Sequence, residues 1–355
     1  LGDTFNDPDN DPARGDWYGI LVGAGAGVVE IDYADLRYGG NAAFAGNGSF
    51  RAPVVTLRGD ATIRRTRIFE ADSRGVSILG AIAPTLESVT VQGANDIALR
   101  MDLSSRPALS GLAATGTGGD RLQIGVGTVS ADMTWNGAGL PIQLEGDVTV
   151  AAGTTLTIPA GQTVKMPLGS SLTFNGDLQA AGVEANPIVF TSTKDDSAGG
   201  DSNANGSANG PVTGDWEGLI FNATSGASAL SYVEVRYAGN AAFPGNGSFY
   251  RNAVSVSSDA SFDRLSIIES DYRGLGISGT AIEPAFTDLA IEGTRDYAIS
   301  MSNASNPSIA GLSVSEAGLR AVLLSGNIEE DRNWNLTEIP YHVAADLTVG
   351  EDATL

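Results

Sequence analysis

The sequence is poor in several residue types, and each shortage excludes a class of protein. It contains no cysteine, which excludes a disulfide-stapled scaffold and thiolate metal sites. It has one histidine, and its only lysines are Lys165 and Lys194. No run of about 18 apolar residues is present, so we expect no membrane insertion. No basic-then-apolar segment opens the chain, so any signal peptide is expected outside it.

Positive charge is scarce, whereas negative charge is abundant. The 355 residues include 42 acidic and 20 basic side chains, which gives a net charge of −22. Such a surface repels phosphate backbones, so we expect no nucleic-acid partner. Many extracellular bacterial proteins are acidic and poor in cysteine and lysine, and we therefore expect an extracellular or cell-surface location. An acidic cytosolic protein or a salt-adapted protein is the alternative.

What the sequence does contain is a long internal repeat. Residues 41–50 read NAAFAGNGSF and residues 240–249 read NAAFPGNGSF, an offset of 199 residues. The same offset relates further pairs: Gly15-Asp16-Trp17 with Gly214-Asp215-Trp216, Arg37-Tyr38 with Arg236-Tyr237, and Trp135 with Trp334. A long period of this kind indicates an array of structural units.

The long period divides the chain into four continuous segments. They are a first unit, incomplete at its start (1–147), plain coils that open the second unit (148–199), a repeat of the first unit (200–346), and the start of a third (347–355). Leu355 corresponds to Leu156, whereas Leu1 falls near Gly200, so the termini lie at different phases of the repeat. We therefore expect the chain to be part of a longer tandem array, or a protomer of a filament.

A finer period lies inside each unit, as an apolar triplet at positions i, i+3 and i+5. Successive triplets start 23 or 24 residues apart, or 32 where the NAAFxGNGSF loop intervenes. The last two positions alternate as in a strand, and the extra residue after the first suits a bend. The eight triplets are Ile31/Ala34/Leu36, Ile63/Thr66/Ile68, Leu86/Val89/Val91, Leu109/Leu112/Ala114, Leu230/Val233/Val235, Phe262/Leu265/Ile267, Phe286/Leu289/Ile291 and Ile309/Leu312/Val314.

Residues 148–190 carry a plainer pattern of apolar pairs every eight residues. The pairs are Val148/Val150, Leu156/Ile158, Val164/Met166 and Leu172/Phe174. Three such sides again make a coil of about 24 residues, which is the unit of a parallel β-helix. Helical spacing of apolar residues is absent, and Gly or Pro interrupts nearly every candidate stretch, so no substantial α-helix is expected.

The stretch LTIPAGQTVKM…GSSLTFNGDLQAAGVEANPIVFTS (156–192), followed by a polar loop and by GDW and LSYVEVRYAG, resembles a known kind of repeat. It is similar to the tandem right-handed parallel β-helix repeats of large secreted bacterial adhesin-like surface proteins, which share the pectate-lyase-like solenoid fold. The resemblance implies an all-β, right-handed parallel β-helix of about 23 residues per coil and implies export. It implies little about activity, because one solenoid serves many functions.

The loops before the Gly-Asp-Trp motifs are the candidates for a Ca²⁺ site. Asp201, Asn203 and Asn205 alternate and precede Gly206, as in the first half of a calcium-binding loop, although Val212 stands where the closing Glu would be. Other candidate ligands are the carboxylates of Asp195 and Asp196 and, in the first copy, of Asp3, Asp7, Asp9 and Asp11. The alternative is a solvated acidic loop, so Ca²⁺ is the only cofactor that we consider.

A second set of charged residues recurs in both copies. It consists of Glu70, Asp72 and Arg74, and of Glu269, Asp271 and Arg273. Carboxylates and an arginine on one face of a solenoid suit an acid/base pair of a polysaccharide lyase or hydrolase. The alternative is a salt-bridged turn before Gly75 and Gly274. Placement in tandem copies favours the turn, and we expect no catalysis.

The NAAFxGNGSF loop is the main lateral decoration of each unit, so any partner surface is expected to include it. Its candidate binding residues are Phe44, Asn47 and Phe50, and Phe243, Asn246 and Phe249. Trp17, Trp216, Tyr38 and Tyr237 recur beside the loops, where aromatic rings either stack on sugars or, as we favour, anchor the loops on the coils.

These patterns favour a structural or adhesive module of an extracellular tandem-repeat surface protein or filament. Its expected partners are other copies, end to end or along the solenoid, and cell-surface glycans. A polysaccharide-binding or polysaccharide-degrading β-helix protein is the alternative.

Overall fold

The computed structural model describes residues 11–41, 52–240 and 250–355. All regular structure in these residues is β-strand, and no helix occurs among them. The strands pair in parallel and form a solenoid of right-handed type with about 12 turns, about 23 residues apart. The predicted fold class is therefore confirmed. In the same part of the chain, no helix is long and apolar enough to cross a membrane.

The chain separates into two compact units. The first unit comprises Leu1–Gly125, Asn136–Gln143 and Gly199–Ala208, and the second comprises Val126–Trp135, Leu144–Ala198 and Asn209–Leu355. The four segments derived from the 199-residue period are units of sequence, and their boundaries stay a prediction.

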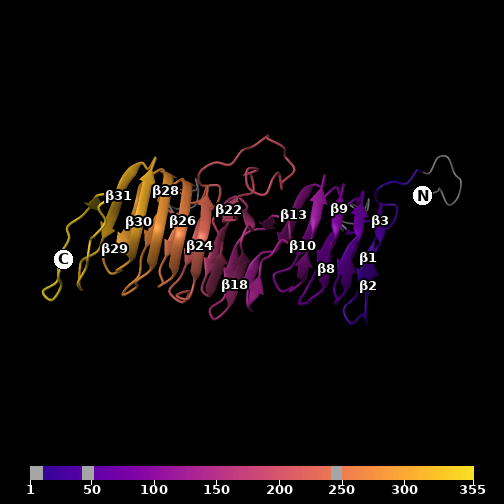
Figure 1. The fold of residues 1–355 in the computed structure, drawn as a ribbon, viewed down its shortest axis with the longest axis horizontal. Helices are drawn as coiled ribbons and strands as arrows, with labels where there is room; N and C mark the ends of the chain where they lie inside the picture. The colour runs from indigo at the N-terminus through magenta and orange to yellow at the C-terminus, as the bar shows by residue number, and fades with distance from the viewer. Residues whose placement is uncertain (1–10, 42–51, 241–249) are drawn as a thin grey trace. The chain divides into compact units, whose positions relative to one another are not determined.

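The first unit has three faces, and each face is a sheet of parallel strands (Figure 1). The first face is formed by β1 (Ile20–Val22), β4 (Val55–Leu57), β7 (Val76–Ile78), β10 (Ile97–Met101) and β13 (Gly119–Ile124). The second is formed by β2 (Glu30–Asp32), β5 (Thr62–Arg64), β8 (Thr85–Glu87) and β11 (Ala108–Ser110). The third is formed by β3 (Asp35–Arg37), β6 (Arg67–Phe69), β9 (Thr90–Gln92) and β12 (Ala113–Thr115). Each of the first four coils therefore contributes one strand to each face, and β13 adds a fifth strand to the first face.

The second unit contains one sheet of short strands and a set of longer, bent strands. The short-strand sheet is formed by β14 (Gly127–Val129), β17 (Val148–Val150), β20 (Ser171–Phe174), β23 (Gly218–Phe221), β25 (Val254–Val256), β27 (Leu275–Ile277), β29 (Tyr297–Ser302), β31 (Leu319–Ser325) and β32 (Tyr341–Val343). The remaining strands are β15 (Met133–Thr134), β18 (Thr155–Pro159), β19 (Thr163–Met166), β21 (Asp177–Ala181), β22 (Ile188–Ser192), β24 (Ala229–Arg236), β26 (Ser261–Ser270), β28 (Ala285–Thr294) and β30 (Ser308–Ser315). β16 (Ile142–Leu144) spans the boundary between the units in sequence.

The bent strands join two faces that are separate strands in the first unit. In β24, residues 229–231 pair with β21, and residues 233–235 pair with β22. The corresponding residues of the first unit form β2 and β3, with a break between them. Both arrangements come from the predicted triplet, whose extra residue marks the bend.

The predicted bend is confirmed in all eight triplets. The residue at i+2 always has a positive φ, between 44° and 73°. These residues are Tyr33, Arg65, Ser88 and Gly111 in the first copy, and Tyr232, Arg264, Asp288 and Gly311 in the second. A non-glycine residue in this conformation costs about 1–2 kcal/mol. The turn of the solenoid therefore depends on neighbouring coils that hold it in place.

A second left-handed corner, which the triplet does not predict, lies at i+7. Its residues are Tyr38, Glu70, Gly93 and Gly116, and Tyr237, Glu269, Gly293 and Glu316. The backbone N–H of Glu70 donates to the carbonyl of Gln92, 2.9 Å away on the next coil, and that of Gly93 donates to Thr115 at 3.0 Å. Inter-coil hydrogen bonds thus continue through the corners and offset the local strain.

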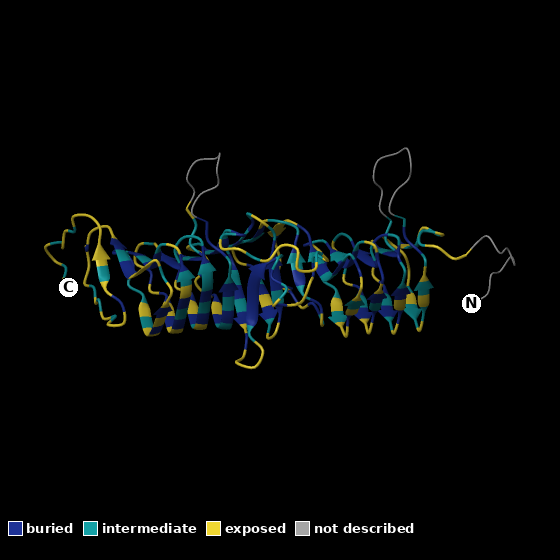
Figure 2. Cartoon of the chain, turned by 90° about the horizontal axis from the view of Figure 1, so that it is seen from above, coloured by how far each residue is buried: buried dark blue, intermediate teal, exposed yellow. Residues whose placement is uncertain are grey.

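The core of each unit is a set of in-register side-chain ladders. Val22, Leu57, Ile78, Met101 and Ile124 follow one another through the first unit and are at most 4% exposed. Burial of each such side chain stabilises the fold by about 1.5–3 kcal/mol. Buried residues accordingly lie inside each unit, and exposed residues gather at the turns (Figure 2).

The second unit builds part of its core from stacked aromatic rings. Phe174 stacks on Phe221 with ring centroids 4.8 Å apart, Phe221 meets Phe262 edge to face at 5.4 Å, and Phe262 stacks on Phe286 at 4.7 Å. All four rings are at most 2% exposed. Val22, Ile63 and Leu86 stand at the corresponding places in the first copy, so the phenyl ladder is specific to the second.

Candidate functional site

The recurring Glu, Asp and Arg of the first copy contribute to a corner of the solenoid. Glu70 occupies the left-handed position and accepts a hydrogen bond from Nε of Arg14 at 2.8 Å. Nε of Arg74 donates to Asp96 at 3.1 Å, and Asp72 accepts from Nδ2 of Asn95 at 3.1 Å. Each of these side chains therefore already has a partner on another turn of the chain.

The second copy reproduces this arrangement. Nε of Arg273 donates to Asp296 at 3.0 Å, and Asp271 pairs with Arg295 at 3.1 Å. Glu269 has the same left-handed conformation as Glu70. The second copy thus repeats the positions of all three groups and the contact between arginine and aspartate, whereas Asp271 pairs with Arg295 where Asp72 contacts Asn95.

Glycines make room for the two recurring glutamates. A Cβ atom built on Gly93 would lie 2.6 Å from Oε1 of Glu70, and one built on Gly293 would lie 2.9 Å from Oε1 of Glu269. Both glycines also have positive φ. The carboxylate of each glutamate therefore lies over the bare backbone of the next coil.

The recurring tryptophans anchor the segments that carry the Gly-Asp-Trp motifs. Nε1 of Trp17 donates to the carbonyl of Arg37 at 2.7 Å, and Nε1 of Trp216 donates to the carbonyl of Arg236 at 2.8 Å. Trp216 is fully buried. The structure therefore gives these indoles the anchoring contacts that we favoured over sugar stacking.

The candidate calcium loop has a turn-like geometry of its own. The carboxylate of Asp201 accepts from the backbone N–H groups of Asn205 at 3.1 Å and Gly206 at 2.8 Å. Oδ1 of Asn203 accepts from the N–H of Asn205 at 3.2 Å. Asp11 is exposed, and Asp3, Asp7 and Asp9 lie outside the described residues.

Among residues 11–41, 52–240 and 250–355, no group of three or more His, Asp or Glu side chains is placed to hold a metal ion. Calcium binding at Asp201, Asn203 and Asn205 therefore stays a prediction of the sequence. The proposed binding-surface residues Phe44, Asn47, Phe50, Phe243, Asn246 and Phe249 also lie outside the described part of the chain.

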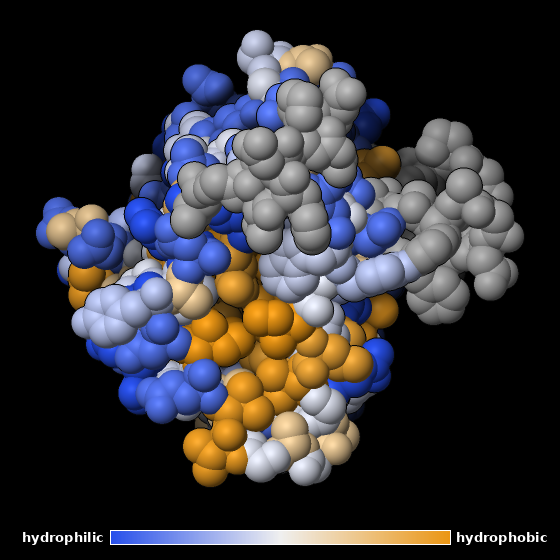
Figure 3. Space-filling model, turned by 90° about the vertical axis from the view of Figure 1, so that its right-hand side faces the viewer, coloured by the Kyte–Doolittle hydropathy of each residue, from blue (hydrophilic) through white to orange (hydrophobic). Residues whose placement is uncertain are grey.

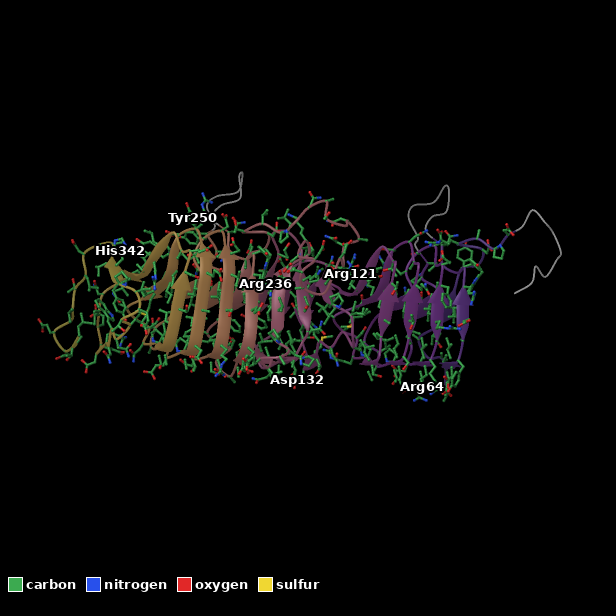
Figure 4. All side chains as sticks on the ribbon, turned by 45° about the horizontal axis from the view of Figure 1, so that its top comes forward. Arg64, Arg121, Asp132, Arg236, Tyr250 and His342 are labelled. Carbon is green, nitrogen blue, oxygen red and sulfur yellow. The ribbon has the colours of Figure 1, made fainter. Side chains whose placement is uncertain are left out.

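Sequence reasoning missed a buried polar cluster in the second unit. Its charged members are Lys165, Lys194, Asp195, Asp215 and Arg236. Lys165 is fully buried, and Asp195 and Asp215 are each 1% exposed. The cluster holds both lysines of the chain (Arg236 is labelled in Figure 4).

Asp195 lies at the centre of one half of this cluster. Nζ of Lys165 donates to the backbone carbonyl of Asp195 at 3.0 Å, and Nη1 of Arg236 lies 3.6 Å from its Oδ2. The carboxylate also accepts from the hydroxyls of Thr191 at 2.7 Å and Ser197 at 2.5 Å. A buried carboxylate with this many donors is satisfied, which is the condition for burying a charge.

Asp215 organises the other half. Lys194 Nζ lies 2.7 Å from Oδ1, while Oδ2 accepts from the hydroxyl of Ser192 at 2.7 Å and from the N–H of Val212 at 3.1 Å. In the first copy, the carboxylate of Asp16 accepts from the N–H of Ala13 at 2.9 Å. The turn at Gly-Asp-Trp is therefore shared by both copies, whereas the lysine contact is described only in the second.

Strand periodicity explains why this cluster is unexpected. Val164 and Met166 of β19 point inward, so Lys165 belongs to the outer face, where a lysine is ordinarily solvated. Lys165 nevertheless pairs in register with Thr191 of β22, and both residues are completely buried. Burial and the nearby carboxylate of Asp195 also raise the pKa of Tyr237. The only sequence signal was the placement of the two lysines.

The arrangement of these charges suits a structural role. The carboxylates of Glu70, Asp195 and Asp215 accept hydrogen bonds from protein donors. An acid/base pair for glycoside chemistry instead needs one carboxylic acid in a proton-retaining environment and one free carboxylate facing a substrate. These contacts give each of the three carboxylates a partner within the solenoid.

Residues 127–258 match a family model described as a pectate-lyase like beta helix domain, which covers less than half of the chain. That stretch is similar to this domain, in agreement with the parallel β-solenoid seen in the structure. No curated protein and no solved structure matches the chain.

Proposed function

We propose that this chain is a structural and adhesive module of an extracellular, tandem-repeat surface protein or filament. One observation carries the proposal: the arginine that recurs after 199 residues contacts an aspartate of the next coil in both copies, Arg74 with Asp96 and Arg273 with Asp296. The contact that the sequence repeat preserves is therefore one that shapes the coil. An array of such coils gains stability with each added neighbour, because every coil buries the apolar face of the next.

The edge of the first unit supports the end-to-end part of this proposal. Leu21 of β1 is 65% exposed, and Val28, just before β2, is fully exposed. Ile31 and Leu36 are half-buried, although Ile63 on the next coil is only 1% exposed. Figure 3 shows the resulting apolar patch. Such a strand edge pairs readily with another chain.

We expect the protein to associate with itself as its concentration rises, and Leu21→Asp to weaken this association about tenfold, which corresponds to ~1.4 kcal/mol. A carboxylate at the β1 edge would have to be desolvated in the assembly. Light scattering over a range of concentrations measures the average mass. Leu168→Asp is the matched control, because Leu168 is 66% exposed in a turn of the second unit. Monomers at all concentrations, or equal effects of both variants, would contradict end-to-end association.

Polysaccharide degradation is the second candidate function, favoured by the match of residues 127–258 to the pectate-lyase like beta helix domain. On the structural proposal, we expect no unsaturated products and no new reducing ends from acidic or neutral polysaccharides. Ultraviolet absorbance measures the unsaturated products, and a reducing-end assay measures the new chain ends. Polysaccharide-cleaving activity that disappears when Asp72→Asn and Asp271→Asn are combined in one variant would instead favour an enzymatic function.

A further inference from the structure

Three tyrosines line consecutive coils of the second unit just before or at the start of its short strands. Tyr250 precedes β25, Tyr272 precedes β27, and Tyr297 begins β29. These strands are neighbours in the sheet, because β25 pairs with β27 and β27 pairs with β29. We refer to Tyr250, Tyr272 and Tyr297 as the tyrosine ladder.

The tyrosine ladder is buried at its Tyr297 end and exposed to solvent at its Tyr250 end. The Tyr250 and Tyr272 rings lie with centroids 4.8 Å apart, at an interplanar angle of 31°. The guanidinium of Arg273 lies 4.5 Å from the Tyr272 ring and 5.7 Å from the Tyr297 ring. Tyr297 is only 8% exposed, whereas Tyr250 is 54% exposed. Figure 4 places Tyr250 at the edge of the second unit.

The solenoid corner does not require these rings. The first copy has Arg51, Ser73 and Ile97 at the corresponding positions. It nevertheless forms the same Arg-Asp contact, at 3.1 Å between Arg74 and Asp96 against 3.0 Å between Arg273 and Asp296. The tyrosines are therefore an addition to a corner that is complete without them, and a large, half-exposed ring is the residue type that binding surfaces use.

Charge narrows the class of ligand. Arg273 is paired with Asp296, and Arg251, which follows Tyr250, lies 3.3 Å from Glu217. The guanidinium groups near the ladder are therefore neutralised, and the chain as a whole carries a charge of −22. An anionic polymer would meet repulsion without a free cation to bind it. A tyrosine face with partly exposed polar groups beside it suits a ligand with both an apolar face and hydroxyls.

We propose that the tyrosine ladder is a binding site for a neutral glycan, with a sugar ring stacked on Tyr250 and its hydroxyls near Arg251 and Glu217. This site goes beyond the structural role proposed above, since a solenoid array needs no ligand. It is also specific to the second copy, so that one array unit of this chain would bind the glycan and the other would not.

Affinity electrophoresis and calorimetry with neutral polysaccharides (dextran, xyloglucan, galactomannan and mixed-linkage β-glucan) test the site, with polygalacturonate as the anionic comparison. We expect at least one neutral polymer to bind, Tyr250→Ala to weaken its binding at least tenfold, and Tyr250→Phe to retain it. Tyr18→Ala is the matched control, because Tyr18 is 53% exposed in the first unit. Unchanged thermal melting of Tyr250→Ala shows that the fold is intact.

Three results would each overturn the proposal: no neutral polymer binds, polygalacturonate alone binds, or Tyr250→Ala binds as tightly as the unmodified protein. The test is independent of the structural role. Loss of self-association in Leu21→Asp would leave glycan binding unchanged, and loss of glycan binding in Tyr250→Ala would leave self-association unchanged.

Discussion

Replacement of Phe262 by alanine is expected to lower the free energy of unfolding of the second unit by about 3–5 kcal/mol. Phe262 is 2% exposed and contacts a ring on each side, Phe221 at 5.4 Å and Phe286 at 4.7 Å. Truncation leaves a cavity between two coils that inter-coil hydrogen bonds hold in place, so the site has little freedom to collapse. Two aromatic contacts are also lost, each worth about 0.5–1.5 kcal/mol.

Phe262→Leu separates the cost of the cavity from the cost of the lost aromatic contacts. It restores an aliphatic side chain like that of Ile63, which stands at the corresponding place in the first copy. We expect it to cost less than half as much as Phe262→Ala, because most of the volume is kept while the ring contacts are lost. Guanidinium chloride unfolding followed by circular dichroism measures both. Equal losses for the two variants would show that ring stacking, and not the cavity, stabilises this part of the core.

Much of the fold could be predicted because its signal is local and repeated. The apolar positions of the triplets recur at the coil spacing, and an inward side chain on every second residue follows from strand geometry alone. Leu86 and Val91, for example, are predicted to point inward and are completely buried. The bend also could be predicted, because two residues between two inward positions, instead of one, cannot be accommodated by plain alternation.

The second corner could not be predicted in this way, because several residue types occupy it. Glu70 and Glu269 adopt a conformation that usually favours glycine, and Glu70 is held there by a hydrogen bond from its backbone N–H to Gln92 on the next coil. Such a preference depends on a neighbour about 23 residues away in sequence. The meaning of the recurring carboxylates was ambiguous for the same reason, since their arginine partners lie on other coils.

Lys165 shows the limit of periodic reasoning most clearly. Its position in β19 predicts a solvated side chain, and the burial arises only because a long-range neighbour covers the outer face. The partner Asp195 was instead interpreted as a calcium ligand. Alternation along a strand predicts which face a residue occupies, but whether that face is covered depends on a loop whose path the sequence pattern does not encode.

Asp195→Asn is expected to destabilise the second unit by about 1.5–3 kcal/mol, the range for hydrogen bonds to a charged group, because it removes the charge of a carboxylate that is only 1% exposed. The variant keeps the shape of the side chain but removes its charge, so Arg236 loses the carboxylate that lies 3.6 Å from its Nη1, whereas Lys165 keeps the backbone carbonyl of residue 195 as its acceptor. The hydroxyls of Thr191 and Ser197 now face an amide instead of a carboxylate, and their charge-assisted hydrogen bonds weaken.

Asp263→Asn is the matched control for this effect. Asp263 pairs with Arg264 at 3.1 Å on the surface of the same unit, with about half of each side chain exposed. We expect its loss to cost about 0–1 kcal/mol, because water and salt screen an exposed pair. The same substitution thus removes a buried carboxylate at one site and an exposed carboxylate at the other. Similar midpoints for Asp195→Asn and Asp263→Asn in guanidinium chloride would contradict the assignment of Asp195 to a buried charge cluster.

A second substitution tests whether Lys165 and the carboxylate of Asp195 anchor the same segment. Lys165→Met removes the fully buried ammonium group, which donates to the backbone carbonyl of Asp195, and keeps most of the side-chain volume. In the double variant with Asp195→Asn, we expect the cost to be smaller than the sum of the two single costs, because both substitutions loosen residue 195, one through its backbone and one through its side chain. Simple additivity would mean that the backbone contact of Lys165 and the side-chain contacts of Asp195 stabilise the second unit independently.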